Sequence, residues 1–462
     1  MVYDNENPAM LLTHSGNENI SGASISLINS LFDYISFSGY ELIDKVSIHT
    51  FECYVKTSMI NFIEIYGCLR KYIIDRYKRS GKFANKLKYF PENVYDVAKT
   101  KVTLKKKNGE TVKCRMRRKV AFFPPINIDY GIRLFLHFYD NVGTIKLIVD
   151  PALLVASRQD GFNAKTYDYI QLAKRDDRFW LEMTKILDRV IYNWNIDKCL
   201  SINNRLKLSR VDITANIRVD SHIQIPQLIR YYKRSLKRTS YRNVEFKYPG
   251  QDLHTMECMN LSQRFTIYDK SYEQYAKYGR SCPYKTMRME YKIYPRRLYT
   301  FKRQMEREHV IYSNSPYHVI LRGFEELAPF IMYQAIDRIF KDGDFYSRKA
   351  FKKLIAKETG RRKTAYEDIM SFMEQVSRFS SYENITKFMA LYKQSHSANS
   401  LNYKLRFLKE KNVSAILMSD NDTIRFSKLP SIKSVFLSAL INGYESGSSD
   451  ELDYIRSFLP DQ

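Results

Sequence analysis

Three segments of this chain alternate strictly between apolar and polar side chains, and this pattern constrains the fold more than any other feature. They are Arg210–Ile217, Arg264–Lys270 and Met287–Tyr294. Successive side chains of a β-strand point to opposite faces, so each segment is predicted to be a strand with one buried face. If the three strands share a sheet, their polar faces bring together Asp212, Glu290, Tyr268, Lys270 and Arg288.

This set of polar side chains suits the transfer of a phosphodiester by a tyrosine with the help of a metal ion. Carboxylates from two strands, Asp212 and Glu290, are suitable ligands for Mg²⁺ or Mn²⁺, which polarises a phosphate oxygen. A phenol has a reference pKa of about 10 and needs a nearby cation to become a nucleophile. Lys270, two residues after Tyr268, is placed to supply that charge. The alternative is an ordinary half-exposed sheet whose polar pairs are structural.

The charge of the chain indicates a polyanionic partner. Its 462 residues include 75 Lys and Arg against 50 Asp and Glu, a net charge of +25, and 14% of the residues are aromatic. Leu228–Lys247 is the most basic stretch between the predicted strands, and its positions 230, 233, 234, 237 and 238 share one face if the stretch is helical. The alternative is a merely solvated helix. With the strand residue Arg288, the expected DNA contacts are Arg230, Lys233, Arg234, Lys237, Arg238, Arg242 and Arg288, and Tyr231, Tyr232 and Tyr241 are candidates for stacking on unpaired bases.

A second basic segment is predicted to be a hairpin. Lys101–Lys107 and Thr111–Val120 flank Asn108-Gly109, a dipeptide typical of a two-residue turn. A basic two-stranded ribbon fits a DNA major groove, although a run of charge is more often a solvated surface.

Several classes of protein are disfavoured. No apolar stretch is long enough for a membrane span, and the N-terminus lacks the pattern of a secretory signal. The six cysteines are scattered without a C-x-x-C pair, so we expect neither a disulfide framework nor a structural zinc site, and a reducing, intracellular setting fits. Neither a P-loop nor a G-x-G-x-x-G motif is present.

The expected fold class is α+β, with an antiparallel-sheet nicking-endonuclease domain flanked by helices and followed by a mainly helical C-terminal domain. We predict a loosely ordered arm at 1–38, a catalytic domain at 39–310 and a helical domain that binds DNA or another partner at 311–462. A long helix, Tyr167–Trp194, carries an apolar stripe that we interpret as core. After residue 297 the pattern is helical, in Pro329–Phe340, Ser347–Lys357, Ala365–Arg378 and Ser400–Glu410.

The order and spacing of the motifs resemble the gene II/X family of rolling-circle replication initiators from filamentous phages and plasmids. The resemblance rests on LSRVDITANI (208–217), RFTIYDKSYE (264–273) and MRMEYKIYPRRLY (287–299), with weaker likeness at 150–163 and 400–418. It implies a nicking and strand-joining endonuclease related to the His-hydrophobe-His superfamily. In this resemblance Tyr268 is the nucleophile, Lys270 its electrostatic partner, and Asp212 and Glu290 the acidic residues of the site. The chain has no His-hydrophobe-His pair, so His254 or Glu257 is a candidate to complete the metal set, and Tyr272 is a second candidate tyrosine.

The resemblance predicts an initiator that nicks one DNA strand at an origin in the cytoplasm of a bacterial host. It would act on double-stranded and single-stranded DNA with a host helicase and polymerase, use Mg²⁺ or Mn²⁺, and have no membrane partner. A 5′-phosphotyrosine and a 3′-OH primer would form, and the displaced strand would later be rejoined. The alternatives are a conjugative or mobilisation relaxase with the same chemistry and a non-catalytic origin-binding protein. A basic RNA-binding protein is disfavoured because no aromatic RNA-binding motif is present.

Overall fold

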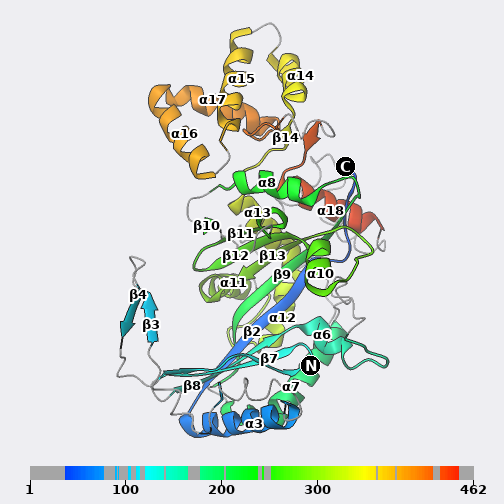
Figure 1. The fold of residues 1–462 in the computed structure, drawn as a ribbon, viewed down its shortest axis with the longest axis vertical. Coiled ribbons are helices and arrows are strands. Elements are labelled where there is room, and N and C mark those ends of the chain that lie inside the picture. The colour runs from blue at the N-terminus through cyan, green and yellow to red at the C-terminus, as the bar shows by residue number, and fades with distance from the viewer. Residues whose placement is uncertain are drawn as a thin grey trace.

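The computed structural model combines helices with a large antiparallel sheet, which confirms the α+β class (Figure 1). It describes residues 37–77, 89–90, 92, 102–105, 111–114, 120–139, 142–164, 177–201, 204–237, 242–243, 251–307, 309–359, 363–379, 382–419 and 427–446. The predicted arm, apart from residues 37–38, lies outside the described residues.

The main sheet has eleven strands. The order is β10-β11-β12-β13-β9-β2-β8-β7-β5, with β1 also paired to β9 and β6 to β7. The bounds are β1 Tyr40–Leu42, β2 Ser47–Thr57, β5 Val120–Phe122, β6 Ile126–Asp129, β7 Ile132–Tyr139, β8 Val142–Val149, β9 Lys207–Val219, β10 Arg242–Asn243, β11 Thr255–Met259, β12 Gln263–Asp269 and β13 Thr286–Ile293. The three strands predicted from alternation are parts of β9, β12 and β13, and they lie side by side.

The sheet consists of two halves with matching strand order about the central β2–β9 pair. On one side β2 is followed outward by β8, β7 and β5, and on the other β9 is followed by β13, β12 and β11. In each half the central strand, β2 or β9, is followed in the sequence by a helix, α3 (Met59–Tyr77) or α8 (Ile225–Arg234), and the outer strands come after that helix. The pairing register puts Thr50 of β2 opposite Asp212 of β9.

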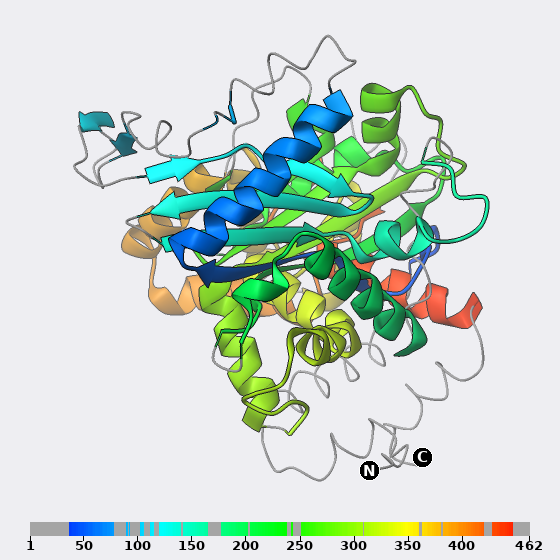
Figure 2. The same cartoon turned by 90° about the horizontal axis from the view of Figure 1, so that it is seen from below.

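One face of the sheet is apolar and carries helices. α3 lies across β7 and β8 (Figure 2), where Phe62 packs so close to Gly143 that a Cβ at this position would overlap the Phe62 ring. α12 (Tyr317–Glu326) also covers this face, since the Tyr317 ring lies 6.4 Å from that of Phe51. Burying this apolar surface is the main stabilising contribution to the fold.

The predicted long helix is observed as α7, Asp177–Asn193, while residues 165–176 lie outside the described part of the chain. Its apolar stripe is buried, as expected for core packing, at Phe179, Met183, Leu187, Val190 and Ile191. The neighbouring short elements are α6 (Pro151–Ala156) and the 3₁₀ helix η1 (Asp197–Cys199).

The C-terminal helices in the described residues are α11 Pro295–Arg307, α12, α13 Ala328–Ile339, α14 Arg348–Thr359, α15 Lys363–Ser377, α16 Tyr382–Ser395, α17 Ala398–Glu410 and α18 Ile432–Ser446, with a small sheet of β14 (Phe345–Tyr346) and β15 (Lys428–Leu429). Of these eight helices, four were predicted by their patterns, namely α13, α14, α15 and α17. In Figure 1 α14–α17 gather at one end, away from α3.

The expected domain boundary near residue 311 does not coincide with a break in the packing. Glu325 of α12 accepts a 2.7 Å hydrogen bond from the backbone N–H of Ile48 in β2, and Phe340 packs on Phe265 of β12. α18 contacts β1. α12, α13 and α18 therefore belong to the same core as the sheet, since the buried residues form one cluster.

The predicted basic hairpin is present in part. β3 (Val102–Lys105) pairs antiparallel with β4 (Thr111–Cys114), with Lys105 opposite Thr111. Residues 106–110, which contain the expected Asn108-Gly109 turn, lie outside the described residues. A two-residue turn would put residue 107 opposite residue 110, and the observed pairing is shifted from that register by one residue.

The described residues also bear on disulfide bonds and on membrane-spanning helices. The five cysteines in the described residues are free thiols. None of the helices in the described ranges has the length and hydropathy needed to cross a bilayer.

Candidate active site

The polar residues predicted to share one surface do so. In the sheet register Tyr268 lies opposite Arg288, Glu290 opposite Thr214, and Lys292 opposite Asp212. Paired residues of antiparallel strands point to the same face. Asp212, Tyr268, Arg288 and Glu290 therefore lie on the face opposite the apolar one, because strict alternation within each strand leaves no other arrangement.

Tyr268 and Glu290 form the centre of the site. The Tyr268 hydroxyl donates a 2.6 Å hydrogen bond to Glu290 Oε1, across the β12–β13 pair. Glu290 is 8% exposed and Tyr268 is partly buried. The site therefore contains a phenol whose proton already points at a carboxylate, the arrangement of a nucleophile and its base.

Cations surround the carboxylate of this pair. Lys292 Nζ lies 3.5 Å from Glu290 Oε2, and Arg288 Nη1 lies 3.9 Å from Glu290 Oε1. Burial alone would raise the pKa of Glu290, but Lys292, His49, Arg288 and the Tyr268 hydroxyl together lower it to about 2. Glu290 is thus ionised at neutral pH.

The phenol is held in its protonated form. Burial and the Glu290 carboxylate raise the pKa of Tyr268 well above its usual value, while Arg288 acts in the opposite direction. Arg288 itself is 1% exposed and its Nε donates a 2.6 Å hydrogen bond to Asn216 Oδ1. The sequence predicted Arg288 as a DNA contact, and the structure places it inside the site, beneath Tyr268 and Glu290.

Lys270 lies beside the tyrosine because β12 ends there and a helix begins. Asp269 accepts a 2.9 Å hydrogen bond from the N–H of Tyr272 and so caps α10 (Lys270–Tyr278). Lys270 Nζ lies 5.7 Å from the centre of the Tyr268 ring and 2.7 Å from Glu273 Oε2. Burial and Arg288 lower the pKa of Lys270, against the effect of Glu273.

Asp212, the second predicted acid, is on the same face but has its own partners. Its Oδ2 accepts a 2.6 Å hydrogen bond from the Thr50 hydroxyl, and Arg210 Nε lies 2.8 Å from its Oδ1. Burial raises the pKa of Asp212, although Arg210, Lys292 and Thr50 all favour the charged form. Asp212 and Glu290 are close enough to repel one another, which also raises the pKa of Asp212.

The predicted Mg²⁺ or Mn²⁺ does not fit these residues as they are arranged. The oxygens of Asp212 and Glu290 face Arg210, Thr50, Lys292 and Tyr268. Within the described ranges, no group of three or more His, Cys, Asp and Glu could hold a metal ion. The metal stays a prediction.

His254, the third predicted ligand, lies away from both acids. It ends α9 (Gln251–His254), its Nδ1 is 3.5 Å from Asp269 Oδ2, and its ring stacks on Tyr272 with 3.6 Å between centres. Asp269 follows Tyr268 in β12 and so points to the opposite face. His254 and Tyr272 therefore form a separate pair on the other side of the strand from Tyr268.

Glu257, the other residue considered for the metal set, does lie on the polar face. It is opposite Thr266 in β12, and Thr266 is in turn opposite Glu290. Its carboxylate pairs with Arg264 at 3.4 Å.

The predicted basic helix is shorter than expected. α8 ends at Arg234, because Leu236 bridges to Phe340 and the N–H of Lys237 donates to the carbonyl of Ile339. Lys237 is therefore not on the helical face, and its Nζ lies 3.7 Å from Asp337 Oδ1. Arg230 is exposed and Lys233 and Arg234 are partly exposed, while Arg242 begins β10. The side chains of Arg238, Tyr241 and Arg242 lie outside the described residues.

The prediction that Tyr231 and Tyr232 stack on unpaired bases is wrong. Both are fully buried, at 1% and 0% exposure, and both pack against Phe345 of β14. They hold the C-terminal part of the chain on α8, and the Tyr231 hydroxyl accepts a 2.9 Å hydrogen bond from the N–H of Ser419.

Sequence reasoning missed several residues of the site. His49 acts on Glu290 from a β-bulge of β2, between Ile48 and Thr50, where the strand register shifts. Asn216 and Glu273 hold Arg288 and Lys270. Alternation in β9 marked Asn216 as a polar-face residue, but the segment around His49 carries no alternating pattern that would have marked it.

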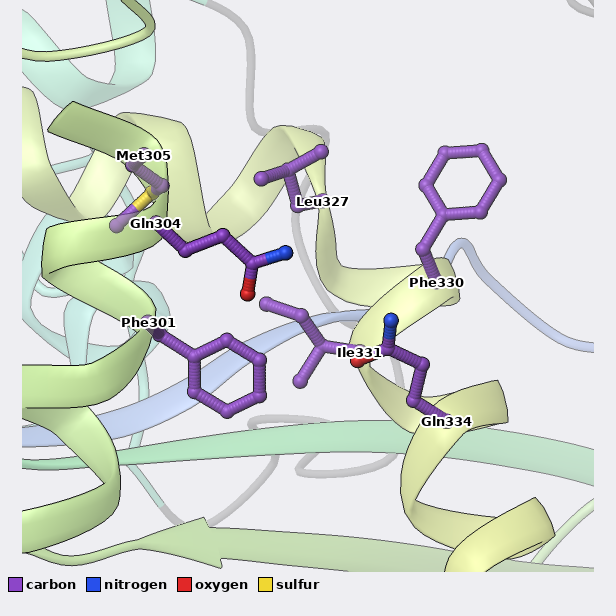
Figure 3. A pocket seen from close by; sticks show the side chains of 7 residues that line it. All are labelled: Phe301, Gln304, Met305, Leu327, Phe330, Ile331 and Gln334. Atoms are coloured by element: carbon purple, nitrogen blue, oxygen red, sulfur yellow. The ribbon is translucent and has the colours of Figure 1, made fainter. Parts of the chain in front are cut away.

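A pocket elsewhere in the molecule has no chemistry of this kind. It lies between α11 and α13, and Figure 3 shows its lining of Phe301, Gln304, Met305, Leu327, Phe330, Ile331 and Gln334. None of these residues can act as an acid, a base or a nucleophile at neutral pH.

Comparison of the chain with protein-family models, with curated proteins and with solved structures finds no match.

Proposed function

We propose that this chain cuts and rejoins DNA strands through Tyr268, as a rolling-circle replication initiator. The observation that carries the proposal is the Tyr268–Glu290 hydrogen bond beside the buried cations Arg288 and Lys270 and the partly exposed Lys292. A carboxylate base that takes the proton of a phenol and cations that stabilise the charge on a phosphate are what phosphodiester transfer to tyrosine requires. The resemblance of the three strand motifs to initiators and the charge of +25 support the same reading.

In the proposed reaction the Tyr268 oxygen attacks phosphorus while its proton passes to Glu290. The bond from phosphorus to the 3′ oxygen breaks, and the 5′ side of the strand stays on the tyrosine as a phosphodiester. The departing 3′ oxygen takes a proton from Lys270, whose lowered pKa favours that transfer. The number of phosphodiester bonds is conserved, so the strand can be rejoined without ATP.

Binding of DNA would itself favour proton transfer from Tyr268 to Glu290. With the pKa of Glu290 at about 2 and that of Tyr268 raised, proton transfer is strongly unfavourable in the free protein. A phosphate that contacts the partly exposed Lys292 would share its positive charge, which would raise the pKa of Glu290 and make it a better base. Arg288 would then neutralise the developing phenolate.

The proposal is tested with a supercoiled plasmid that carries the gene for this chain and its flanking DNA, in the presence of Mn²⁺. Wild type is expected to convert it to the nicked circle and to leave protein on the 5′ end, while Tyr268→Phe is not. Tyr272→Phe is the matched control and is expected to nick like wild type. If Tyr268→Phe nicks normally, the proposal is wrong.

A parallel reaction with EDTA decides the metal prediction. Loss of nicking with recovery on added Mn²⁺ or Mg²⁺ would confirm it, and nicking in EDTA would contradict it. A relaxase would give the same products, so the two are separated by whether the chain maintains a plasmid or transfers one. A non-catalytic origin-binding protein would retain the DNA on a gel without nicking it.

A further inference from the structure

The polar face of the sheet continues from the Tyr268 site into the other half of the sheet. There the register aligns Lys207 of β9, Tyr54 of β2, Lys146 of β8 and Phe135 of β7 in one row across four strands. These residues lie on the face that bears Arg210 and Asp212, because Glu52, two residues before Tyr54, lies opposite Arg210, and a register shift after Glu52 brings Lys207 opposite Tyr54. The row thus presents cation, aromatic, cation and aromatic side chains in turn.

The next row has the same character and is more exposed. Lys56 lies opposite Thr144, Thr144 opposite His137, and His137 opposite Phe122. Phe122 is 66% exposed, and its ring meets that of His137 edge-on at 5.6 Å between centres. An exposed phenylalanine on β5, the edge strand of this basic sheet face, has no role in the core that the helices cover on the opposite face.

The row that contains Tyr54 occupies the position in its half of the sheet that the row containing Tyr268 occupies in the other half. Tyr54 is four residues beyond Thr50 in β2, Asn216 is four residues beyond Asp212 in β9, and Thr50 and Asp212 face one another. The row Tyr54–Lys146–Phe135 is therefore the counterpart of Asn216–Arg288–Tyr268. In both rows a cation lies beside an aromatic ring, but Phe135 has no hydroxyl.

We infer that this face, defined by Lys207, Tyr54, Lys146, Phe135, Lys56 and Phe122 and called the β2–β8–β7 platform, binds single-stranded DNA. Aromatic side chains on a basic surface stack the bases of an unpaired strand while the cations contact its backbone. Glu52, the acid on this face that pairs with Lys146 at 3.1 Å and with Arg210 at 2.9 Å, connects the platform to the Tyr268 site. The inference extends the proposed function by assigning a path for the strand, but the binding itself does not require that Tyr268 is a nucleophile.

The test is fluorescence anisotropy with a labelled oligothymidylate, which stacks but does not form a duplex. Tyr54→Ala with Phe135→Ala is expected to weaken its binding at least about tenfold, because each lost stack removes a base contact. Binding of a labelled duplex is expected to change less than about twofold, since paired bases cannot stack on the platform. Tyr192→Ala, which removes an aromatic ring that is 70% exposed on α7, is the matched control and is expected to leave both affinities unchanged.

Two further variants make the result independent of folding and of catalysis. Phe122→Ala removes an exposed ring, and Lys207→Glu reverses an exposed charge, so neither should lower the melting temperature. Both are expected to weaken oligothymidylate binding, and Tyr268→Phe is expected to bind like wild type. If the platform variants bind the oligonucleotide like wild type, or weaken duplex binding equally, the inference is overturned whether or not the chain nicks DNA. If the platform variants weaken the binding of an oligouridylate but not that of the oligothymidylate, the face binds RNA and the inference is also overturned.

Discussion

The Tyr268 hydroxyl donates a 2.6 Å hydrogen bond to Glu290 Oε1 on the neighbouring strand. The two residues are offset by two pairs in the register, since Tyr268 lies opposite Arg288 and Glu290 opposite Thr266. The phenol thus reaches diagonally across the β12–β13 pair, over the buried guanidinium of Arg288. This single contact connects the fold to the proposed chemistry.

Glu290→Gln is expected to make stability less dependent on pH. The pKa of Glu290 is lowered from 4.5 to about 2, so its ionised form contributes stability that is present above about pH 4.5 and is lost as the pH falls towards 2. The shift corresponds to an upper value of roughly 3 kcal/mol. Urea unfolding of wild type and Glu290→Gln should therefore differ most at pH 6 and least near pH 2. An equal difference at both pH values would contradict the assigned charge.

Lys270→Gln is expected to lower the rate of nicking while leaving DNA binding nearly unchanged. The ammonium lies near the Tyr268 ring and supplies the proposed proton and charge, which a neutral amide cannot, and general acid catalysis is worth roughly 100-fold or more. Single-turnover nicking and a filter-binding assay measure the two effects. Lys277, which pairs with the same Glu273 but is 56% exposed, gives the control Lys277→Gln with little expected effect on either. Equal losses in the two variants would show that the ion pairs of Glu273 matter only for structure.

Arg230 and Tyr232 are expected to behave in opposite ways, although they are neighbours in the basic segment. Arg230 is exposed, so Arg230→Ala should change the free energy of unfolding by less than about 0.5 kcal/mol. If Arg230 contacts one phosphate, the variant should also reduce the slope of log K for DNA binding against log salt concentration by about 0.7–0.9. Tyr232 is fully buried, and Tyr232→Ala should cost about 3–5 kcal/mol. Denaturant unfolding and binding at several salt concentrations measure both. A Tyr232→Ala variant as stable as wild type would contradict the packing of α8 described here.

Gly343→Ala is expected to destabilise the C-terminal part of the chain. Gly343 has a φ of +102°, and a Cβ there would overlap the backbone of Val413 and Ser414. Strained backbone alone costs roughly 1–3 kcal/mol, and the overlap adds to this. Gly161→Ala is the control, since Gly161 has a φ of +76° but open space around the added Cβ. Thermal unfolding should show the larger loss for Gly343→Ala, and equal losses would show that the close approach to Val413 is not present in solution.

The sequence predicted the faces of the sheet well because alternation is a local property. The partners of Val211, Phe265 and Met289 need not be known for their sides to be assigned, and all three are buried as expected. The same reasoning placed Asp212, Tyr268 and Glu290 on one surface. It also indicated Lys270 near Tyr268, because a helix that begins directly after the strand keeps the side chain close.

Other features depend on contacts between distant parts of the chain and could not be predicted in this way. α8 ends at Arg234 because Leu236 pairs with Phe340, about a hundred residues away. Tyr231 and Tyr232 looked like stacking residues within a basic run, and only the packing of Phe345 shows that they are core. His49 reaches Glu290 through a bulge, which changes the side to which a strand residue points.

The most direct test of the central claim is to identify the amino acid that becomes linked to DNA. The chain is reacted with single-stranded origin DNA labelled at the phosphate that is cut, digested with protease and nuclease, and the labelled peptide is sequenced by mass spectrometry. The account predicts one phosphorylated peptide, modified at Tyr268 and absent from Tyr268→Phe. Modification at Tyr272 or at another residue, or a nicked product with a free 5′ phosphate and no linked peptide, would contradict it.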